Sequence, residues 1–476
     1  MIGIRKQFMI FNEMINNGSI RKPYKKIDKW IKSFVENSYE KKHQEAQRIF
    51  KRIGITFSVY EKKSPQERMI PFDMVPRIFT SNEWKLIESG IKQRTKALNL
   101  FLHDVYNDAS IIKEKIIPAE LVYKSRAFES SMVGFSPPRK IFSHISGIDV
   151  VRTSLNKFVV LEDNCRTPSG VSYMMQNREI MMTMFPDLFN DNSIESIDDY
   201  PVNLRKMLTS IAPASCKNDP VIVVLTPGSY NSAYYEHSFL ADLMGVELVE
   251  GEDLFTEKDR VYMRTVTGPK KVDVIYRRID DNYLDPLCFD QNSLIGVPGV
   301  MNAYRNGNVT ICSAPGCGIA DDKAIYSYVP DIIKFYLSEK PILDNVKTWN
   351  CGREKDLKFV LQNIKDLVVK EVHGSGGHGM LIGPKATKNQ IKIFTKKIKN
   401  NPQKYIAQPT LDLSTCPTYT SNGMSPRHVD LRPFCLMGRE MNVIKGALTR
   451  VALKENSLIV NSSQGGGVKD TWVLRK

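Results

Sequence analysis

The chain has 476 residues, of which 42% are hydrophobic and 9% aromatic, enough to bury the cores of several lobes. This composition excludes a largely disordered protein, and no apolar run reaches the length of a membrane span or of a signal peptide's core. The eight cysteines have no C-x-x-C spacing, which favours a reduced, cytoplasmic setting and suggests no zinc site.

The net charge of +15 raises the hypothesis of a nucleic-acid-binding protein, which needs a concentrated basic face or a known module. The basic residues are instead spread along the chain. Local concentrations at 21–52 and 385–404 carry no recognisable motif. We therefore expect a basic surface that attracts small anionic substrates, and nucleic acid is the disfavoured partner.

The N-terminal segment, residues 1–100, is expected to be helical. Three roles are open for it: a cap, a dimer contact or a substrate clamp. Its pattern does not choose among them, and the sequence does not indicate an oligomeric state.

Two apolar, β-branched segments, 145–152 and 158–164, are separated by a polar stretch and predict a β-hairpin. With a four-residue loop, Asp149 lies opposite Glu162, and Asn164 follows on the same face. Two carboxylates and an amide beside a nucleotide suit magnesium. For any one of these residues a solvated strand end is the better interpretation. For the set, placed among valines and a leucine, we favour a magnesium site.

Between residues 220 and 249 the pattern predicts a βαβ unit. Its strands are 220–225 and 246–249, and its helix lies near 236–244. A further strand ends in Arg277 and Arg278. Ligands bind at strand ends in α/β sheets, so these arginines are candidates for substrate contact, and surface ion pairing is the competing interpretation.

The strand predicted at 366–372 carries Lys370 and precedes the glycine-rich loop 374–379. Bare amides of such a loop can fold over phosphates, with the lysine as a point charge. The spacing matches G-x-G-x-x-G, but 380–382 continues as a strand and the region about 20 residues on is lysine-rich, so a dinucleotide fingerprint is rejected. No G-K-[ST] occurs, which excludes a Walker A motif. Strand, glycine loop and strand indicate a lid hairpin.

The lysine-rich tract 385–404 predicts an amphipathic helix with a solvated face. The strand predicted at 405–409 contains Gln408, whose amide suits an adenine edge at a hinge between lobes. Downstream, Arg432 and Arg450 are of the residue type that makes bidentate contacts with phosphate or carboxylate.

Near the C-terminus lies a second polar, glycine-rich loop, 461–470. The apolar segments 458–460 and 471–474 on either side predict strands that hold this loop in place.

These motifs resemble the circularly permuted ATP-grasp family, type 2, which is related to the synthetase domain of glutathionylspermidine synthase. The likeness runs from about Leu102 to Trp472 and rests mainly on segments 102–106, 117–121, 160–164, 225–228, 276–278 and 463–467. In ATP-grasp enzymes generally, the lysines, lid and adenine hinge precede the acidic metal residues. The inverted order here is the one that a circular permutation produces.

The resemblance implies an α/β protein with α+β elements: a multi-lobed, circularly permuted ATP-grasp fold with a Rossmann-like pre-ATP-grasp lobe and a helical N-terminal segment. The expected divisions are 1–100 for the helical segment, 101–215 for the permuted part with the magnesium hairpin, 216–318 for the Rossmann-like substrate lobe, 319–411 for the lid and phosphate-binding lobe, and 412–476 for the C-terminal ATP-grasp part.

The implied activity is an ATP- and magnesium-dependent carboxylate–amine ligase, in which a substrate carboxylate attacks the γ-phosphate and an amine captures the acylphosphate as an amide. Carried over by position, the magnesium ligands are Asp149, Glu162 and Asn164. The nucleotide contacts are Lys323 and Lys370 on the phosphates, the lid residues Gly374, Ser375, Gly376, Gly377, His378 and Gly379, and Gln408 on the adenine side.

One position departs from the relatives. Glutathionylspermidine synthases carry an arginine two residues before the first metal aspartate, where this chain has Gly147. The candidates to stabilise the acylphosphate instead are Arg166, Arg432 and Arg450. His144 is a further candidate, and a core or capping role for it is as well supported.

Two alternatives to the ligase stay open: an ATP-grasp scaffold that binds nucleotide without catalysis, and the disfavoured nucleic-acid binder. Intact Asp149, Glu162, Asn164 and Lys370 speak against a degenerate site. The expected partners are small-molecule or peptide carboxylates and amines, with no membrane partner. The sequence does not identify either substrate.

Overall fold

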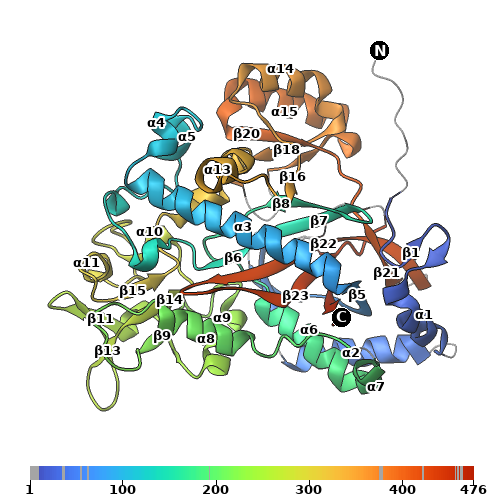
Figure 1. The fold of residues 1–476 in the computed structure, drawn as a ribbon, viewed down its shortest axis with the longest axis horizontal. Helices are drawn as coiled ribbons and strands as arrows, with labels where there is room; N and C mark the ends of the chain where they lie inside the picture. The colour runs from blue at the N-terminus through green and yellow to red at the C-terminus, as the bar shows by residue number, and fades with distance from the viewer. Residues whose placement is uncertain are drawn as a thin grey trace.

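The computed structural model describes residues 10–34, 38–53, 56–61, 64–191, 193–374, 379–420, 423–455, 457, 460 and 465–476. They form a mixed α/β protein, as the sequence predicts (Figure 1). A long helix, α3 (Ser81–Tyr106), crosses in front of a large sheet, and a small lobe with α14 (Glu354–Asn363) and α15 (Lys388–Asn400) lies above it in the view. Within the described residues, no helix combines the length and the apolar character that crossing a bilayer requires.

The largest sheet among the described residues has nine strands. Its order is β16-β8-β7-β22-β23-β24-β5, and β6 and β21 also pair with β22. These strands are β5 (Phe72–Phe79), β6 (Ile145–Gly147), β7 (Asp149–Ser154), β8 (Lys157–Glu162), β16 (Asp344–Asn345), β21 (Thr415–Thr420), β22 (Gly423–Met437), β23 (Met441–Val451) and β24 (Gly467–Val473). Segments far apart in the chain thus lie side by side, with β7 next to β22.

Helix α3 covers one face of this sheet. It starts at a capping box, in which Thr80 and Glu83 satisfy each other's backbone amides. Its apolar side chains Trp84, Ile87 and Ile91 recur at helical spacing and pack in one buried cluster with Val150 and Leu431 of the sheet. Asp149 of β7 and Asp430 and Arg432 of β22 lie on the opposite face.

The predicted hairpin is present with two corrections. Its loop is the pair 155–156, because Ser154 and Lys157 belong to the strands and pair with each other. The segment 145–152 is also not one strand, since it breaks at Ile148 into β6, which pairs with β22, and β7, which pairs with β8. Two register shifts along the hairpin leave Asp149 paired with Glu162, as predicted.

A second lobe contains the parallel sheet β10-β9-β14-β15, and the predicted βαβ unit is confirmed. Its elements are β9 (Ile222–Leu225), α9 (Tyr234–Met244), β10 (Glu247–Val249), β14 (Val274–Arg277) and β15 (Thr310–Cys312). Gly245 ends α9 with a φ of 63°, a conformation that glycine adopts without strain. A small antiparallel sheet of β11 (Leu254–Glu257), β12 (Arg260–Met263) and β13 (Lys270–Val272) adjoins this lobe.

The upper lobe is an antiparallel sheet, β17-β20-β18-β19, with helices α14 and α15. The strands are β17 (Trp349–Asn350), β18 (Leu367–Glu371), β19 (Leu381–Ile382) and β20 (Tyr405–Pro409). The strand pair of the predicted hairpin is confirmed as β18–β19, and the amphipathic helix as α15. Residues 375–378 at the tip of the hairpin lie outside the described part.

The N-terminal segment is not purely helical. Besides η1 (Lys22–Tyr24), α1 (Lys25–Lys32) and α2 (Ser38–Ile53), it contains the short pairs β1–β2 (Ile15–Asn16 and Ser19–Ile20) and β3–β4 (Thr56–Glu61 and Ser64–Met69). Strand β5 then joins the main sheet, parallel to β24. The buried pattern of β5 explains its place there.

The remaining helices connect these lobes: α4 (Ser110–Lys113), α5 (Ala119–Tyr123), α6 (Val171–Met184), α7 (Pro186–Asp191), α8 (Tyr200–Ser210), α10 (Asp281–Leu284), α11 (Val300–Arg305), α12 (Lys323–Tyr326) and α13 (Val329–Leu337), with the 3-10 turns η2 (Ser130–Met132), η3 (Pro138–Lys140), η4 (Gly251–Asp253), η5 (Cys317–Asp321), η6 (Ile364–Asp366), η7 (Gly383–Lys385) and η8 (Pro402–Lys404). Of the C-terminal predictions, residues 458, 459 and 461–464 lie outside the described part. The loop predicted at 461–470 is too long, because its last four residues, 467–470, belong to β24, which also includes 471–473 of the predicted strand.

Candidate functional site

Asp149 lies in a buried cluster of two carboxylates and two arginines. Arg432 donates to its carboxylate through Nε at 2.6 Å and Nη2 at 2.9 Å, and Arg450 donates through Nη2 at 2.7 Å. Arg450 also donates through Nε to Asp430 at 2.9 Å, its partner across β22 and β23. Because Leu431 pairs with Val150 on the α3 face, the cluster occupies the other face of the sheet.

The electrostatics of this cluster favour an ionised Asp149. Burial on its own would raise the pKa of the Asp149 carboxyl, but Arg432 and Arg450 outweigh burial and lower it to about 2. The same carboxylates raise the pKa of Arg450. For Asp430 burial outweighs its arginine partners, so its pKa is raised. The cluster brings together two of the predicted catalytic arginines and one predicted metal ligand.

Glu162, at the end of β8, contacts the predicted phosphate lysine Lys323. The Lys323 Nζ lies 2.9 Å from Glu162 Oε1 and donates to the carbonyl of Gly374 at 2.7 Å. Lys323 opens α12, as predicted, and Asp322 caps that helix by accepting from the Ala324 amide. One lysine thus joins the end of the β7–β8 hairpin to the residues that follow β18.

Lys370 points toward the same group of charges from β18. Among the described residues its ammonium has no hydrogen-bond or ion-pair partner, and burial lowers its pKa to about 8. Lys323 lowers this pKa further, while Glu162 and Asp149 act in the opposite direction. The side chain of Lys370 is half-buried, and a partly desolvated cation without a counter-ion favours an anionic ligand. The two halves of the predicted nucleotide site therefore meet in space.

The side chains around the hairpin fit a magnesium ion in their chemistry. Glu162 Oε2 and Asn164 Oδ1 accept no hydrogen bond from the described residues, and the Asn164 amide is oriented by donating to the Gly147 carbonyl at 3.1 Å. Asp149 already accepts three arginine bonds of the roughly four that a carboxylate can take. Within the described ranges, no three His, Cys, Asp or Glu residues form a metal-binding group. The free oxygens are one carboxylate and one amide, which suit magnesium.

The side chain of Asp163, between Glu162 and Asn164, does not join the proposed metal ligands but contacts helix α3. It is buried and accepts from Nη2 of Arg94 in α3 at 2.7 Å. Arg94 in turn donates through Nη1 to Asn345 at 2.6 Å. Asp163 therefore holds the hairpin against helix α3.

The third arginine candidate, Arg166, has a different partner. It donates to Asp280 at 2.7 Å, and both side chains are well exposed, at 37% and 44%. Burial lowers the pKa of the Arg166 guanidinium, but Asp280 and Asp321 outweigh it, so the pKa is raised. Of the three arginines, only Arg432 and Arg450 bind Asp149.

Gln408 is buried in β20, opposite Val368 of β18. Its side-chain amide donates to Thr348 Oγ1 at 3.0 Å. Strand β20 thus places this side chain in the upper lobe, on the sheet that also carries Lys370.

Gly147 and His144 lie close to Asp149 in the sequence. A Cβ on Gly147 would lie 2.8 Å from Pro168 Cβ and 3.2 Å from Arg432 Cδ, so the space above this glycine is filled. His144 is fully buried, and neither ring nitrogen has a partner among the described residues. Burial lowers its pKa to about 3, which keeps the imidazole neutral.

Asp430 is the residue of this site to which sequence reasoning gave no role. It lies two residues before Arg432 on one strand, and side chains at this spacing share a face. The D-x-R pattern within β22 is therefore the signal that could have placed it beside the arginines.

Comparison with known proteins defines the class as ATP-grasp. The solved structure of a glutathione synthetase-like effector from Globodera pallida, in its apo form, aligns with a TM-score of 0.60 over 93% of this chain and 98% of that one. The two sequences are 10% identical, so this likeness concerns the fold alone. The chain itself belongs to the circularly permuted ATP-grasp type 2 family, whose pattern it matches over residues 76–452.

Related proteins align with most of the chain. An uncharacterized protein of Synechocystis sp. is 48% identical, covering 94% of this chain and 93% of that protein. An uncharacterized protein of Mycobacterium tuberculosis is 48% identical, covering 98% and 84%. A Frankia casuarinae protein named "Putative glutamate--cysteine ligase 2-2" is 41% identical over 86% of this chain, which spans only 47% of that longer protein.

Proposed function

We propose that the protein is an ATP- and magnesium-dependent carboxylate–amine ligase that acts through an acylphosphate. The observation that carries the proposal is the position of Lys370, a half-buried cation with no partner among the described residues, beside Lys323 and Glu162. Two lysines from separate parts of the chain lie beside two side-chain oxygens that are free to bind a metal. This arrangement suits a nucleoside triphosphate with its metal ion.

In this proposal each part of the site has one task. Glu162, Asn164 and the remaining lone pair of Asp149 hold magnesium, which when bound neutralises phosphate charge. Lys323 and Lys370 bind the phosphates, the loop 374–379 closes over them, and Gln408 faces the adenine. The division of the chain into the five parts expected from the sequence belongs to the same proposal.

The arginines take the substrate carboxylate. Arg432 is the candidate that the geometry favours, because it is partly exposed and its side chain fills the space above Gly147. Arg450, which is held between Asp149 and Asp430, is the second candidate and lies beside Arg432. Arg166 binds Asp280 instead and is the third candidate. A carboxylate oxygen attacks the γ-phosphorus as the bond to ADP breaks. The amine nitrogen then attacks the acyl carbon, phosphate leaves, and the nitrogen loses its proton.

The substrates are a small-molecule or peptide carboxylate and an amine. The Frankia relatives named as glutamate–cysteine ligases support the ligase class, although this chain spans about half of their length, 47% and 54%. The free cysteines agree with a cytoplasmic enzyme. A screen of amino acids, peptides and amines for ADP release, with Glu162→Ala as the inactive control, tests the activity. Substrate-dependent ADP without an amide product would contradict ligation.

One observation favours a second candidate, a nucleotide-binding scaffold without catalysis. The carboxylate of Asp149 accepts three arginine bonds, which leaves it little capacity for a metal. Magnesium-independent ATP binding, with no ADP formed under any substrate pair, is the result expected for the scaffold.

A further inference from the structure

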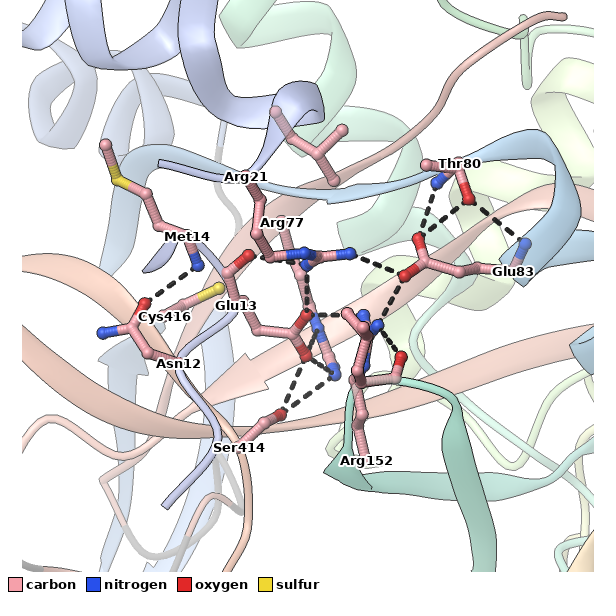
Figure 2. A network of polar contacts seen from close by, with 12 residues as sticks. Asn12, Glu13, Met14, Arg21, Arg77, Thr80, Glu83, Arg152, Ser414 and Cys416 are labelled. Atoms are coloured by element: carbon pink, nitrogen blue, oxygen red, sulfur yellow. Dashed lines mark hydrogen bonds and ion pairs between the residues drawn. The ribbon is translucent and has the colours of Figure 1, made fainter. Parts of the chain in front are cut away.

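A second buried charge cluster lies further along strand β7, around Glu13 of the N-terminal segment (Figure 2). Glu13 is fully buried. Its carboxylate accepts from Arg77 Nη2 at 2.6 Å, from Arg152 Nη1 at 2.8 Å and from Ser414 Oγ at 2.8 Å. These partners come from β5, from β7 and from the residue before β21. Three separate parts of the fold therefore converge on one carboxylate supplied by the N-terminal segment.

The N-terminal segment is held there by its main chain as well. The Glu13 amide donates to the Thr415 carbonyl at 2.8 Å, and the Thr415 amide donates to the Phe11 carbonyl at 2.9 Å. Arg21 of the same segment donates to the Glu13 carbonyl at 2.6 Å. Burial would raise the pKa of Glu13, but Arg77 and Arg152 outweigh it and lower the pKa. The result is a carboxylate-binding site that the chain fills with its own glutamate.

One partner of Glu13 connects this cluster to the candidate site. Arg77 donates through Nη1 to the main-chain carbonyl of Asp430 at 3.0 Å. The side chain of Asp430 binds Arg450, which also binds Asp149. A continuous series of contacts thus runs from Glu13 through Arg77 and strand β22 to the arginine cluster.

We propose that Glu13 is a positioning residue of the candidate site: by fixing Arg77 it fixes Asp430 and, through Asp430, the orientation of Arg450 and Asp149. This inference rests on the proposed function, in which Asp149 contributes to magnesium binding. Groups that hydrogen-bond a metal ligand directly commonly change metal affinity by about 10- to 100-fold when they are removed. Glu13 acts on Asp149 only through Arg77, Asp430 and Arg450, so we expect a change at or below the lower end of that range.

The test compares Glu13→Gln with Glu83→Gln. Glu83 belongs to the same cluster and binds Arg21 and Arg152, but in Figure 2 no dashed line joins it to Arg77. Glutamine also keeps the capping box of α3. Magnesium is titrated into each protein saturated with ATP, with binding followed by calorimetry and unfolding followed by heat. We expect magnesium binding that is weaker by up to about 10-fold in Glu13→Gln and wild-type affinity in Glu83→Gln.

Chemical rescue separates positioning from loss of folding. Glu13→Ala opens space for a small carboxylate between Arg77 and Arg152, so millimolar acetate should restore its magnesium affinity and leave the wild type unchanged. Equal magnesium affinity in wild type and Glu13→Gln, or an equal loss in Glu83→Gln, would overturn the inference. Absence of magnesium-dependent ATP binding in the wild type would instead show that the proposed function itself fails.

Discussion

The side chain of Arg432 lies against the backbone of Gly147, so that a methyl group on this glycine would meet Arg432 Cδ at 3.2 Å and Pro168 Cβ at 2.8 Å. The contact explains why Gly147 suits a chain that holds an arginine on the neighbouring strand β22. It also places Arg432 over the hairpin that carries the proposed magnesium ligands.

Gly147→Ala should destabilise the protein, because Pro168 is rigid and Arg432 cannot move without leaving Asp149. Overpacking of this kind costs about 1–3 kcal/mol of unfolding free energy, measured by urea denaturation. Gly318→Ala is the comparison, since its methyl would lie 3.2 Å from Ala127 and 3.3 Å from the flexible chain of Arg166. An unchanged urea midpoint in Gly147→Ala would contradict the packing described here.

Arg450→Ala should cost far more stability than Arg166→Ala. Arg450 is buried between Asp149 and Asp430, and removing it leaves carboxylates without a partner, a loss of about 3–5 kcal/mol. The exposed pair of Arg166 and Asp280 contributes less than about 1 kcal/mol. Similar unfolding free energies for the two variants would refute the assignment of Arg450 to the buried cluster.

Acid should weaken the fold through Asp149. Its folded pKa of about 2 lies below the ordinary value of about 3.9, so the unfolded chain binds the proton more readily. The stabilisation is complete above about pH 4 and declines as the pH falls toward 2. Unfolding free energies measured between pH 5 and 2.5 should show a smaller pH dependence in Asp149→Asn. A curve identical to wild type would count against the low pKa.

Nucleotide binding should take up a proton at Lys370. Its pKa of about 8 in the free protein means that part of the population is neutral at pH 8 to 9, and bound phosphates favour the charged form. Calorimetry of ATP binding at pH 8.5, in buffers with different ionisation enthalpies, measures this uptake. Lys370→Met should abolish it, and uptake that persists in the variant would assign the proton to another group.

The sequence predicts the local parts of this structure well. Apolar, β-branched runs give the hairpin β7–β8, the pair β18–β19 and the strands of the βαβ unit, because these patterns reflect local burial. The pairing of Asp149 with Glu162 follows from that periodicity. The break at Ile148 does not, since it arises when β6 pairs with β22, nearly 300 residues later in the chain.

Long-range partners are what the sequence could not supply. Arg432 and Arg450 are visible as arginines, but their binding to Asp149 depends on β22 lying beside β7. The cluster of Glu13 with Arg77 and Arg152 is likewise assembled from three distant segments. A helical N-terminal segment was the natural expectation, because nothing local indicates that β5 completes the main sheet.

The most direct measurement is the shift in melting temperature on adding Mg-ATP, compared with ATP plus chelator and with Lys370→Ala. A ligand at about 100 times its Kd stabilises a fold by about 2.7 kcal/mol, which gives a clear rise in Tm. We expect a magnesium-dependent rise in the wild type that is lost in Lys370→Ala. No shift in a folded wild-type protein, or an equal shift in the variant, would contradict a nucleotide site formed by the hairpin and the lid lobe.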